Sequence, residues 1–512
     1  MRRLWLPLAA AASFLLASIE DSALAPKHDL GTFLIDPPTP YTHYLPPDVP
    51  KGKVLAVHGL DVSREVMSFI SAALADGGFE VYAIDLPGHG ASKAKFQTAV
   101  AEQAIRNVAA ALGETTVVLG HSLGAGLLLD LSANHHFSTL VLLSPPPVAI
   151  DEIRADRVLI AAGAIDLPRI RSFVPIAADI GGTHVETWTL PWAAHSAAIL
   201  NPVYVGRIVE WLGGNARRTR TLARMAWLVV MFVAAIVLGI ELLTVGPSPS
   251  GRGRRDSQRA GAPGEGGAKR EPDRAKPQEK SIRILRPSPY PFPEREGGSS
   301  PRAVLIRYIA ACGSGLIILK LGNPLGWLRL FGTDYLIGFI FLTGLFLTVA
   351  VLCARREAVI DRPDSFNRRA VFRAAAAAAY VIVVLGLLVS SHVLNMSLSG
   401  NRWWRFPVIF AAGLPFFASD EWMIRHLEPC WKCIGVALLT RGLLLAFLLA
   451  GVLILNRENV FLVLIAPLIT LFWIGLWFAA GVVYKSTADP YAAGIFSALV
   501  QGWAFAAWFV IL

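Results

Sequence analysis

One serine in the chain stands in a setting that favours nucleophilic chemistry. It is Ser122, which lies between two glycines in Gly120-His121-Ser122-Leu123-Gly124. An apolar run at residues 116–119 precedes this segment, and residues 125–131, which have good helix propensity, follow it. This order predicts a strand, a tight turn and a helix, with the serine hydroxyl exposed at the carboxyl end of the strand. A serine that only caps a helix would fit the same five residues, so the prediction depends on the rest of the chain.

The elements that must position Ser122 are short β-rich runs between residues 31 and 213. Runs at residues 53–57 and 80–84 end in His58-Gly59-Leu60 and in Asp85-Leu86-Pro87-Gly88-His89-Gly90-Ala91-Ser92. Further strands are expected at residues 116–119, 139–143, 157–161 and 184–190, with helical patterns between most of them. This alternation predicts an α/β fold with a doubly wound, mostly parallel sheet. Ligands bind at the carboxyl ends of the strands in such sheets, where all three polar segments would lie.

The same segments carry a resemblance to a known family. Residues 50–213 resemble the α/β-hydrolase superfamily of serine hydrolases. The family's Ser, Asp, His order implies that Ser122 is the nucleophile, that Asp166 is the acid and that His195 is the base. Asp166 comes in the loop after residues 157–161, and His195 comes just past the last expected strand.

The resemblance also implies a role for each group. His195 would take the hydroxyl proton of Ser122 during attack and return it to the leaving group, while Asp166 would fix the imidazole tautomer and stabilise the imidazolium. The backbone N–H groups of Leu60 and Leu123 would hold the oxyanion of the tetrahedral intermediate. No cofactor is implied, and no metal-ligand spacing occurs in this half of the chain.

Rival residues exist for two of these roles. His184 is the other candidate base, but it would lie at the beginning of the last strand. Asp151 and Asp156 are the other candidate acids, and both come before a strand instead of after it. We interpret His58, His89 and His121 as packing and hydrogen-bonding members of their turns, and not as bases or metal ligands.

The segment between two of the expected strands is short. Only residues 144–156 separate the strand at 139–143 from Arg157, which leaves no room for the helical cap that many relatives insert there. The site is therefore expected to be open. It would suit a lipid-like substrate if the membrane or the rest of the chain covered it, and a small soluble ester if nothing did.

Composition indicates that part of the chain lies in a membrane. The 512 residues are 54% hydrophobic and 16% charged, which is too apolar for an ordinary soluble enzyme. The net charge of +10 comes from arginines beside apolar runs and in a linker, so we expect contact with lipid headgroups and not with nucleic acid. Residues 1–24, which begin Met1-Arg2-Arg3, are typical of a signal peptide or signal anchor. Pro26, directly after a small-residue cleavage pattern, favours the anchor.

The expected domains follow from these changes in composition. A hydrolase domain spans residues 25–213, a basic segment with one transmembrane helix spans 214–245, a Pro/Gly-rich linker spans 246–302 and a polytopic membrane domain spans 303–512. Helices of the last domain are expected at residues 303–321, 334–354, 371–394, 406–424, 434–455, 459–484 and 491–512. The fourth is interrupted by Pro407, Pro415, Asp420 and Glu421. Asp420 and Glu421 would be functional or would lie in the interface or pair with Arg425 and His426.

Charge also predicts orientation. The loop at residues 355–369 carries five arginines and should be cytoplasmic. Two crossings back along the chain the linker is then cytoplasmic too, and one crossing further the hydrolase domain lies outside. The arginines at residues 217–224 argue for the opposite orientation. Cys430-Trp431-Lys432-Cys433 has a Cys-x-x-Cys spacing but no second pair, which makes redox or zinc chemistry a weak prediction.

The sequence thus predicts a membrane-bound serine hydrolase that cleaves carboxylic esters through an acyl-enzyme on Ser122. Two other interpretations stay open. The same triad serves acyltransferases, thioesterases and peptidases, and a non-catalytic binding module attached to a transporter or sensor belongs to a different class.

Overall fold

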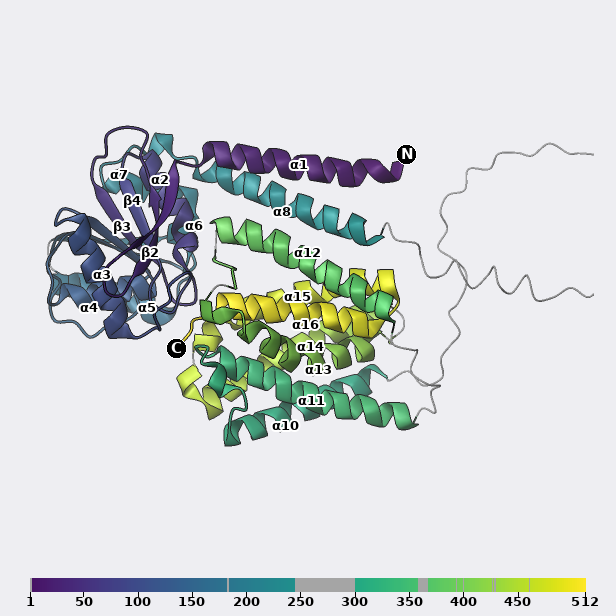
Figure 1. Cartoon of the computed structure of the whole chain (residues 1–512). Helices are drawn as coiled ribbons and strands as arrows, with labels where there is room; N and C mark the ends of the chain where they lie inside the picture. The colour runs from purple at the N-terminus through teal and green to yellow at the C-terminus, as the bar shows by residue number, and fades with distance from the viewer. Residues whose placement is uncertain are drawn as a thin grey trace, which may run out of the picture.

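The computed structural model describes residues 2–181, 184–244, 300–357, 367–392, 394–398, 400–425, 427, 430–459 and 461–512. Most of the predicted linker and residues 358–366 of the arginine-rich loop lie outside the described residues, as does His426. The described chain forms a sheet unit, residues 28–211, and a helical unit, residues 301–512. The sheet unit lies at one end of the long helices, and the N-terminus lies at their other end (Figure 1).

The sheet unit is built on eight strands in the order β1-β2-β4-β3-β5-β6-β7-β8. The strands are β1 His28–Phe33, β2 Thr39–Tyr44, β3 Lys53–Val57, β4 Glu80–Ile84, β5 Val117–His121, β6 Phe137–Leu143, β7 Ala155–Gly163 and β8 Val185–Leu190. The six strands β3 to β8 pair parallel to one another. Each is joined to the next along the chain by a crossover connection, as parallel pairing requires. The expected mostly parallel α/β fold is confirmed.

Helices cover both faces of this sheet (Figure 1). One face packs against α3 Thr98–Leu112, α4 Leu123–Ser132 and α5 Pro168–Gly181. The other packs against α2 Ser68–Asp76, α6 Ala197–Leu200 and α7 Pro202–Trp211. The central strands are largely apolar because both of their faces are buried in this way.

Strands β1 and β2 were not expected from the sequence. They pair antiparallel to each other, and β2 pairs antiparallel to β4. Both are short and polar, and β1 forms the edge of the sheet. Aromatic contacts hold them in place, with ring centroids 4.5 Å apart for Phe33 and Tyr41 and 5.5 Å apart for Tyr41 and Tyr82.

In the described part of the chain, nine long helices precede or follow the sheet unit. They are α1 Arg2–Leu24, α8 Thr221–Thr244, α10 Pro301–Leu321, α11 Thr333–Glu357, α12 Arg368–His392, α13 Arg405–Arg425, α14 Cys430–Ala450 with a π turn at Gly451–Leu455, α15 Phe461–Thr487 and α16 Pro490–Trp508. Within the described ranges, seven helices are long and apolar enough to cross a membrane, and α13 and α16 are not among them. A helix lies at each of the seven positions expected in the second half of the chain.

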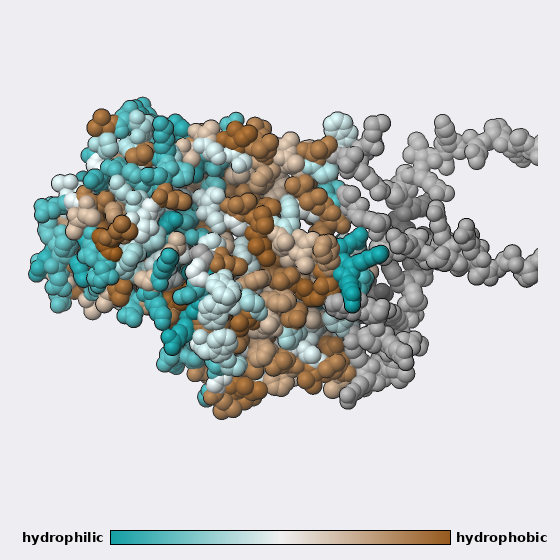
Figure 2. All heavy atoms as spheres, viewed as in Figure 1, coloured by the Kyte–Doolittle hydropathy of each residue, from teal (hydrophilic) through white to brown (hydrophobic). Residues whose placement is uncertain are grey.

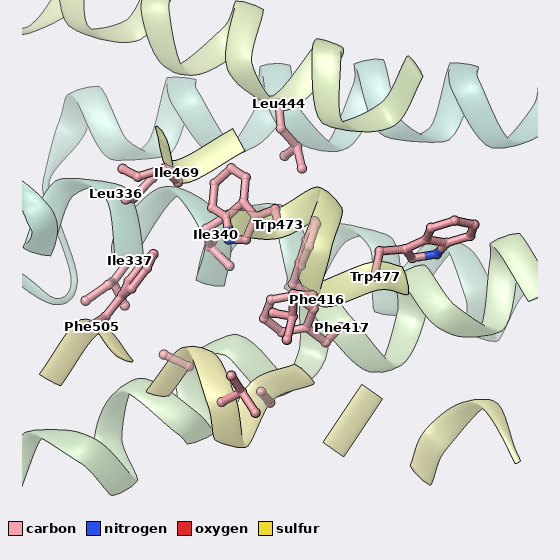
Figure 3. Close-up of a cluster of buried hydrophobic side chains, with 14 of the residues drawn as sticks. Leu336, Ile337, Ile340, Phe416, Phe417, Leu444, Ile469, Trp473, Trp477 and Phe505 are labelled. Carbon is pink, nitrogen blue, oxygen red and sulfur yellow. The ribbon is translucent and has the colours of Figure 1, made fainter. Parts of the chain in front are cut away.

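The helical unit has its own apolar core, shared by α11, α13, α14, α15 and α16 (Figure 3). Small residues let α13 and α16 approach closely: a Cβ on Gly494 would lie 2.7 Å from the Cα of Ala418, and one on Gly502 would lie 3.0 Å from the backbone N of Phe410. The side of this unit seen in Figure 2 is largely hydrophobic, whereas the sheet unit is mostly hydrophilic.

The two carboxylates of α13 are buried and paired. Arg441 of α14 donates to Asp420 from Nη2 at 2.6 Å and from Nη1 at 2.8 Å, and Tyr308 of α10 also donates to Asp420. Arg425 donates to Glu421 at 2.7 Å, as the sequence suggested. Because each carboxylate has a cationic partner, α13 can continue through both positions without a break.

A second buried cluster joins α1 to the rest of the molecule. Asp21 of α1 lies 3.3 Å from Arg224 of α8 and 2.8 Å from Nε2 of His392 at the end of α12. The carbonyl oxygen of His392 accepts a hydrogen bond from Ser68 of the sheet unit at 2.6 Å. The sheet unit is therefore attached to three of the long helices at one place.

Candidate active site

Ser122 stands at the turn between β5 and α4. Its backbone φ is +52°, which is strained for a residue with a side chain. The flanking glycines are required by space: a Cβ on Gly120 would lie 2.6 Å from the backbone N of Ala125, and one on Gly124 would lie 2.6 Å from the carbonyl oxygen of Val57. The tight turn exposes the Ser122 hydroxyl at the carboxyl end of β5.

The structure brings Ser122, His195 and Asp166 together. Nε2 of His195 lies 2.8 Å from Oγ of Ser122, and Nδ1 of His195 lies 2.9 Å from Oδ1 of Asp166. A carboxylate can only accept, so Nδ1 carries the ring proton and Nε2 is free to accept the proton of the hydroxyl. Asp166 follows β7 and His195 follows β8, so neighbouring parallel strands deliver both side chains to the same edge of the sheet.

The rival residues lie elsewhere. Asp156 is the second residue of β7, at the opposite end of the strand from Asp166, and pairs with the exposed side chain of His136. Asp151 is exposed in the connection before β7, and His184 precedes β8. None of the three is hydrogen-bonded to Ser122 in the part of the chain that the structure describes.

Asp166 is buried and its carboxylate form is stabilised. Burial by itself would raise its pKa, but hydrogen bonds to the carboxylate, of which the one from His195 Nδ1–H at 2.9 Å is the strongest, outweigh this effect. The pKa of Asp166 is therefore held below its ordinary value, and the group stays charged beside the imidazole.

Two further residues hold the backbone of His195. Ser144 donates from Oγ to the carbonyl oxygen of His195 at 3.0 Å, and His121 donates to the same oxygen from Nε2 at 3.1 Å. Burial lowers the pKa of His121 to about 3, so this ring is neutral. Sequence analysis gave His121 such a packing role but missed Ser144, whose only signal is its position directly after an apolar strand.

The oxyanion donors expected from the sequence are the N–H groups of Leu60 and Leu123. Neither donates a hydrogen bond within the described ranges. Gly59 lies against the nucleophile, since a Cβ placed on it would be 3.1 Å from Cβ of Ser122. Gly124 N–H bonds the carbonyl oxygen of His58 at 3.2 Å, which ties the loop after β3 to the turn after β5.

His58 braces this loop. Its Nδ1 donates to the carbonyl oxygen of Gly59 at 2.7 Å, and its Nε2 accepts from Leu86 N–H at 3.1 Å. Burial lowers the pKa of His58, which fits the acceptor role of Nε2. Asp85, at the end of β4, accepts from Arg64 N–H and Nη1, both at 2.8 Å, and from Ala91 N–H at 2.9 Å. These contacts fix the two loops beside Ser122.

Two side chains near the triad in the chain are exposed. Residues 144–154, which connect β6 to β7, contain no helix. Trp192 is 89% exposed and Ile165 is 61% exposed, and they lie three residues from His195 and next to Asp166 in the chain. Among the described residues, no group of three or more His, Cys, Asp or Glu side chains could hold a metal ion. The side chain of Cys430 lies outside the described residues, and Cys433 donates to the carbonyl oxygen of Leu427.

Comparison with known proteins agrees with this geometry. Residues 54–275 match the sequence model of the alpha/beta hydrolase family. The chain contains an α/β-hydrolase domain. No curated protein matches the chain. Among solved structures similar to the hydrolase domain is a predicted CIB-like hydrolase from Thermoplasma acidophilum, with 19% identity, a TM-score of 0.32 and coverage of 36% of this chain and 99% of that one.

Two further solved structures show the same extent of similarity. A monoacylglycerol lipase from Paleococcus ferrophilus has 17% identity and a TM-score of 0.31, with coverage of 37% of this chain and 99% of that one. A carboxylesterase from Bacillus subtilis has 17% identity and a TM-score of 0.33, with coverage of 40% and 98%.

Proposed function

We propose that the protein is a membrane-bound serine hydrolase that cleaves carboxylic esters through an acyl-enzyme on Ser122. The observation that carries the proposal is the chain of contacts from Ser122 Oγ to His195 Nε2 at 2.8 Å and from His195 Nδ1 to Asp166 at 2.9 Å. The two unpaired N–H groups beside Ser122 support it, because an oxyanion needs donors that are already in place.

The reaction follows from these positions. Nε2 of His195 takes the proton of Ser122 as Oγ bonds to the ester carbonyl carbon, and the N–H groups of Leu60 and Leu123 bind the oxygen that becomes negative. The imidazolium then gives its proton to the departing alcohol, which leaves an acyl group on Oγ. Water attacks the acyl carbon with His195 again as the base, and the acid product leaves as Ser122 regains its proton.

The second half of the proposal concerns location and substrate class. The long apolar helices would cross the membrane, with the hydrolase domain at the end opposite to the N-terminus, to the last residues of α11 and to the first residues of α12. Because arginine-rich loops stay cytoplasmic, the domain would lie on the extracytoplasmic side. An open site next to the membrane surface, with exposed Trp192 and Ile165, suits lipid-like esters.

Ester hydrolysis by the full-length protein tests the activity. The detergent-solubilised protein would be given p-nitrophenyl esters of increasing acyl length, beside Ser122→Ala and the control Ser172→Ala, whose exposed hydroxyl bonds only to its own helix. We expect turnover by the wild type and the control, none by Ser122→Ala, and a preference for long acyl chains. A folded wild type that hydrolyses no ester would overturn the enzyme proposal, and a preference for acetate would overturn the lipid-like substrate.

Orientation has its own test. Leu34 is 92% exposed on the hydrolase domain, so Leu34→Cys gives an accessible thiol there. A membrane-impermeant maleimide should label this variant in intact cells, with the unmodified chain as the control for its native cysteines. Labelling that appears only after lysis would place the domain in the cytoplasm.

A further inference from the structure

The last residue of α16, Trp508, and the four residues after it contact the hydrolase domain. Part of this contact is with the loop after β3, which carries Leu60, one of the expected oxyanion donors. Nε1 of Trp508 donates to the carbonyl oxygen of Asp61 at 2.7 Å. The backbone N–H of Val510 donates to Oδ1 of the same aspartate at 3.1 Å. The two partners are 447 and 449 residues apart in the sequence. The helical unit thus holds Asp61 by both its backbone and its side chain.

The same five residues are themselves held on both sides. Ile511 donates to the carbonyl oxygen of Gly88 at 3.2 Å and accepts from Phe96 N–H at 3.3 Å, so it is bonded to the loop after β4. On its other side Ile511 forms an antiparallel bridge with Leu330, between α10 and α11. Residues 509–512 therefore lie between the hydrolase domain and the helical unit and are hydrogen-bonded to both.

A buried arginine reinforces this junction. Nη2 of Arg402 donates to the carbonyl oxygen of Gly88 at 3.2 Å, and Nη1 donates to that of Phe509 at 2.6 Å. Arg402 precedes α13, so the hydrolase loop, the C-terminal segment and the start of α13 share one hydrogen-bonding centre. Such a buried centre restricts movement of the C-terminal segment relative to the hydrolase loops.

Asp61 connects the C-terminal segment to the backbone of the candidate active site. It directly follows Leu60, and its φ of +54° is strained for a residue other than glycine. It is buried, and its Oδ2 atom has no hydrogen-bond partner among the described residues. A strained backbone persists only when surrounding contacts hold it, and the contacts found here come from Trp508 and Val510. If they were lost, Asp61 would relax and turn the adjoining peptide groups of residues 59–61.

We infer that Trp508 and Asp61 are positioning residues for the oxyanion site, so that the C-terminal segment of the helical unit sets the catalytic rate of the hydrolase domain. This inference rests on the proposed function. It predicts an effect on stabilisation of the transition state and little effect on binding of the ester in its ground state, because the hydrogen bonds of the triad in the described part of the chain do not involve the segment.

The test compares two tryptophans of α16 in the full-length protein. Trp508→Phe removes the N–H that bonds Asp61 and keeps an aromatic ring. The control Trp503→Phe removes a similar buried N–H, which bonds Met396 of the helical unit at 3.2 Å. With p-nitrophenyl esters, we expect Trp508→Phe to lower kcat by about tenfold to 100-fold with KM nearly constant, since loss of a whole oxyanion donor costs about 10²- to 10³-fold. Trp503→Phe should keep the wild-type kcat.

A second readout separates positioning from a general loss of structure. A phenylboronic acid forms a tetrahedral adduct with an active serine and places an oxygen in the oxyanion site, so its inhibition constant should rise by the same factor as kcat falls. Asp61→Asn keeps an acceptor for Val510 N–H and tolerates positive φ, whereas Asp61→Gly tolerates positive φ without an acceptor. We expect Asp61→Asn to stay within about threefold of the wild-type kcat and Asp61→Gly to resemble Trp508→Phe.

The outcomes distinguish the two proposals. Suppose that the wild type hydrolyses esters and that Trp508→Phe and Trp503→Phe have the same kcat and the same boronate affinity as each other. This result would overturn the inference and leave the proposed function standing. Wild type that is folded and hydrolyses no ester would overturn the proposed function. A fall in kcat of Trp508→Phe with unchanged boronate affinity would also overturn the inference, because the oxyanion site would then be intact.

Discussion

Replacement of Asp166 by asparagine has an outcome that depends on one atom. Oδ1 of Asp166 accepts both from His195 Nδ1–H at 2.9 Å and from Leu167 N–H at 2.7 Å, while Oδ2 has no partner among the described residues. An asparagine amide must therefore place its oxygen at the Oδ1 position, because an NH₂ group there would face two donors. In Asp166→Asn the imidazole keeps its tautomer, and only the negative charge is lost.

The size of the effect follows from that charge. Two unit charges about 4 Å apart interact by about 4 kcal/mol at an effective dielectric constant of about 20, and each 1.36 kcal/mol is about tenfold in rate. We expect Asp166→Asn to lower kcat by about 10³-fold. An amide that turned its NH₂ toward the ring would fix the wrong tautomer and cost about 10⁴-fold. Asp166→Ala, which loses charge and orientation together, should be at least as slow as that.

The assay is steady-state hydrolysis of a p-nitrophenyl ester by the full-length variants, with active sites counted by titration. Asp156→Asn is the matched control, since it removes the same charge from an exposed residue at the other end of β7. The reasoning would be refuted if Asp166→Asn lost less than tenfold in kcat, or if it were slower than Asp166→Ala.

Three other predictions concern packing, buried charge and pH. Gly163→Ala should lower activity at least tenfold and the free energy of unfolding by about 1–3 kcal/mol, because its Cβ would lie 2.1 Å from the carbonyl oxygen of Ala193 in the turn that carries His195; kinetics and thermal unfolding check this. Arg441→Leu should destabilise the protein by about 3–5 kcal/mol, because Asp420 is left charged and unpaired, and the Asp420→Leu/Arg441→Leu double variant should recover most of that; a double variant as unstable as the single one would contradict it. His121, with its pKa lowered to about 3, binds a proton in the unfolded chain but not in the folded one below about pH 6.5, so it should remove up to about 1.4 kcal/mol of stability per unit as pH falls from about 6.5 to 3. The denaturation midpoint of His121→Asn should then depend less steeply on pH than that of the wild type, and equal slopes would contradict the assignment.

The parts of the fold that local sequence specifies were predictable. Apolar runs gave the central strands, because a strand covered on both faces has no polar side to mask its pattern. The spacing of Gly120, Ser122 and Gly124 indicated the turn, since the space around each glycine admits no side chain. Asp166 could be preferred to Asp156 and Asp151, and His195 to His184, because only residues after a parallel strand lie at the edge of the sheet where ligands bind.

Long-range pairing limited the rest. Asp420 and Glu421 were expected to interrupt a helix because two charged residues are unfavourable in an apolar segment. The sequence did not show that Arg441, on another helix, pairs with Asp420. Ser144 lacked a motif of its own. The contact of Trp508 with Asp61 joins residues 447 positions apart, and nothing in either local sequence indicates it. Strands β1 and β2 were missed because both are polar and are held by a few aromatic contacts and not by a continuous apolar pattern.

The most direct test of the central claim is labelling of the full-length, detergent-solubilised protein with a fluorophosphonate, followed by peptide mapping of the labelled residue. The contacts of Ser122 with His195 predict a covalent adduct on Ser122 in the wild type, none in Ser122→Ala, and labelling reduced by several orders of magnitude in His195→Ala. A folded wild type that takes up no label, or a label that persists in Ser122→Ala, would contradict the assignment of Ser122 as the nucleophile.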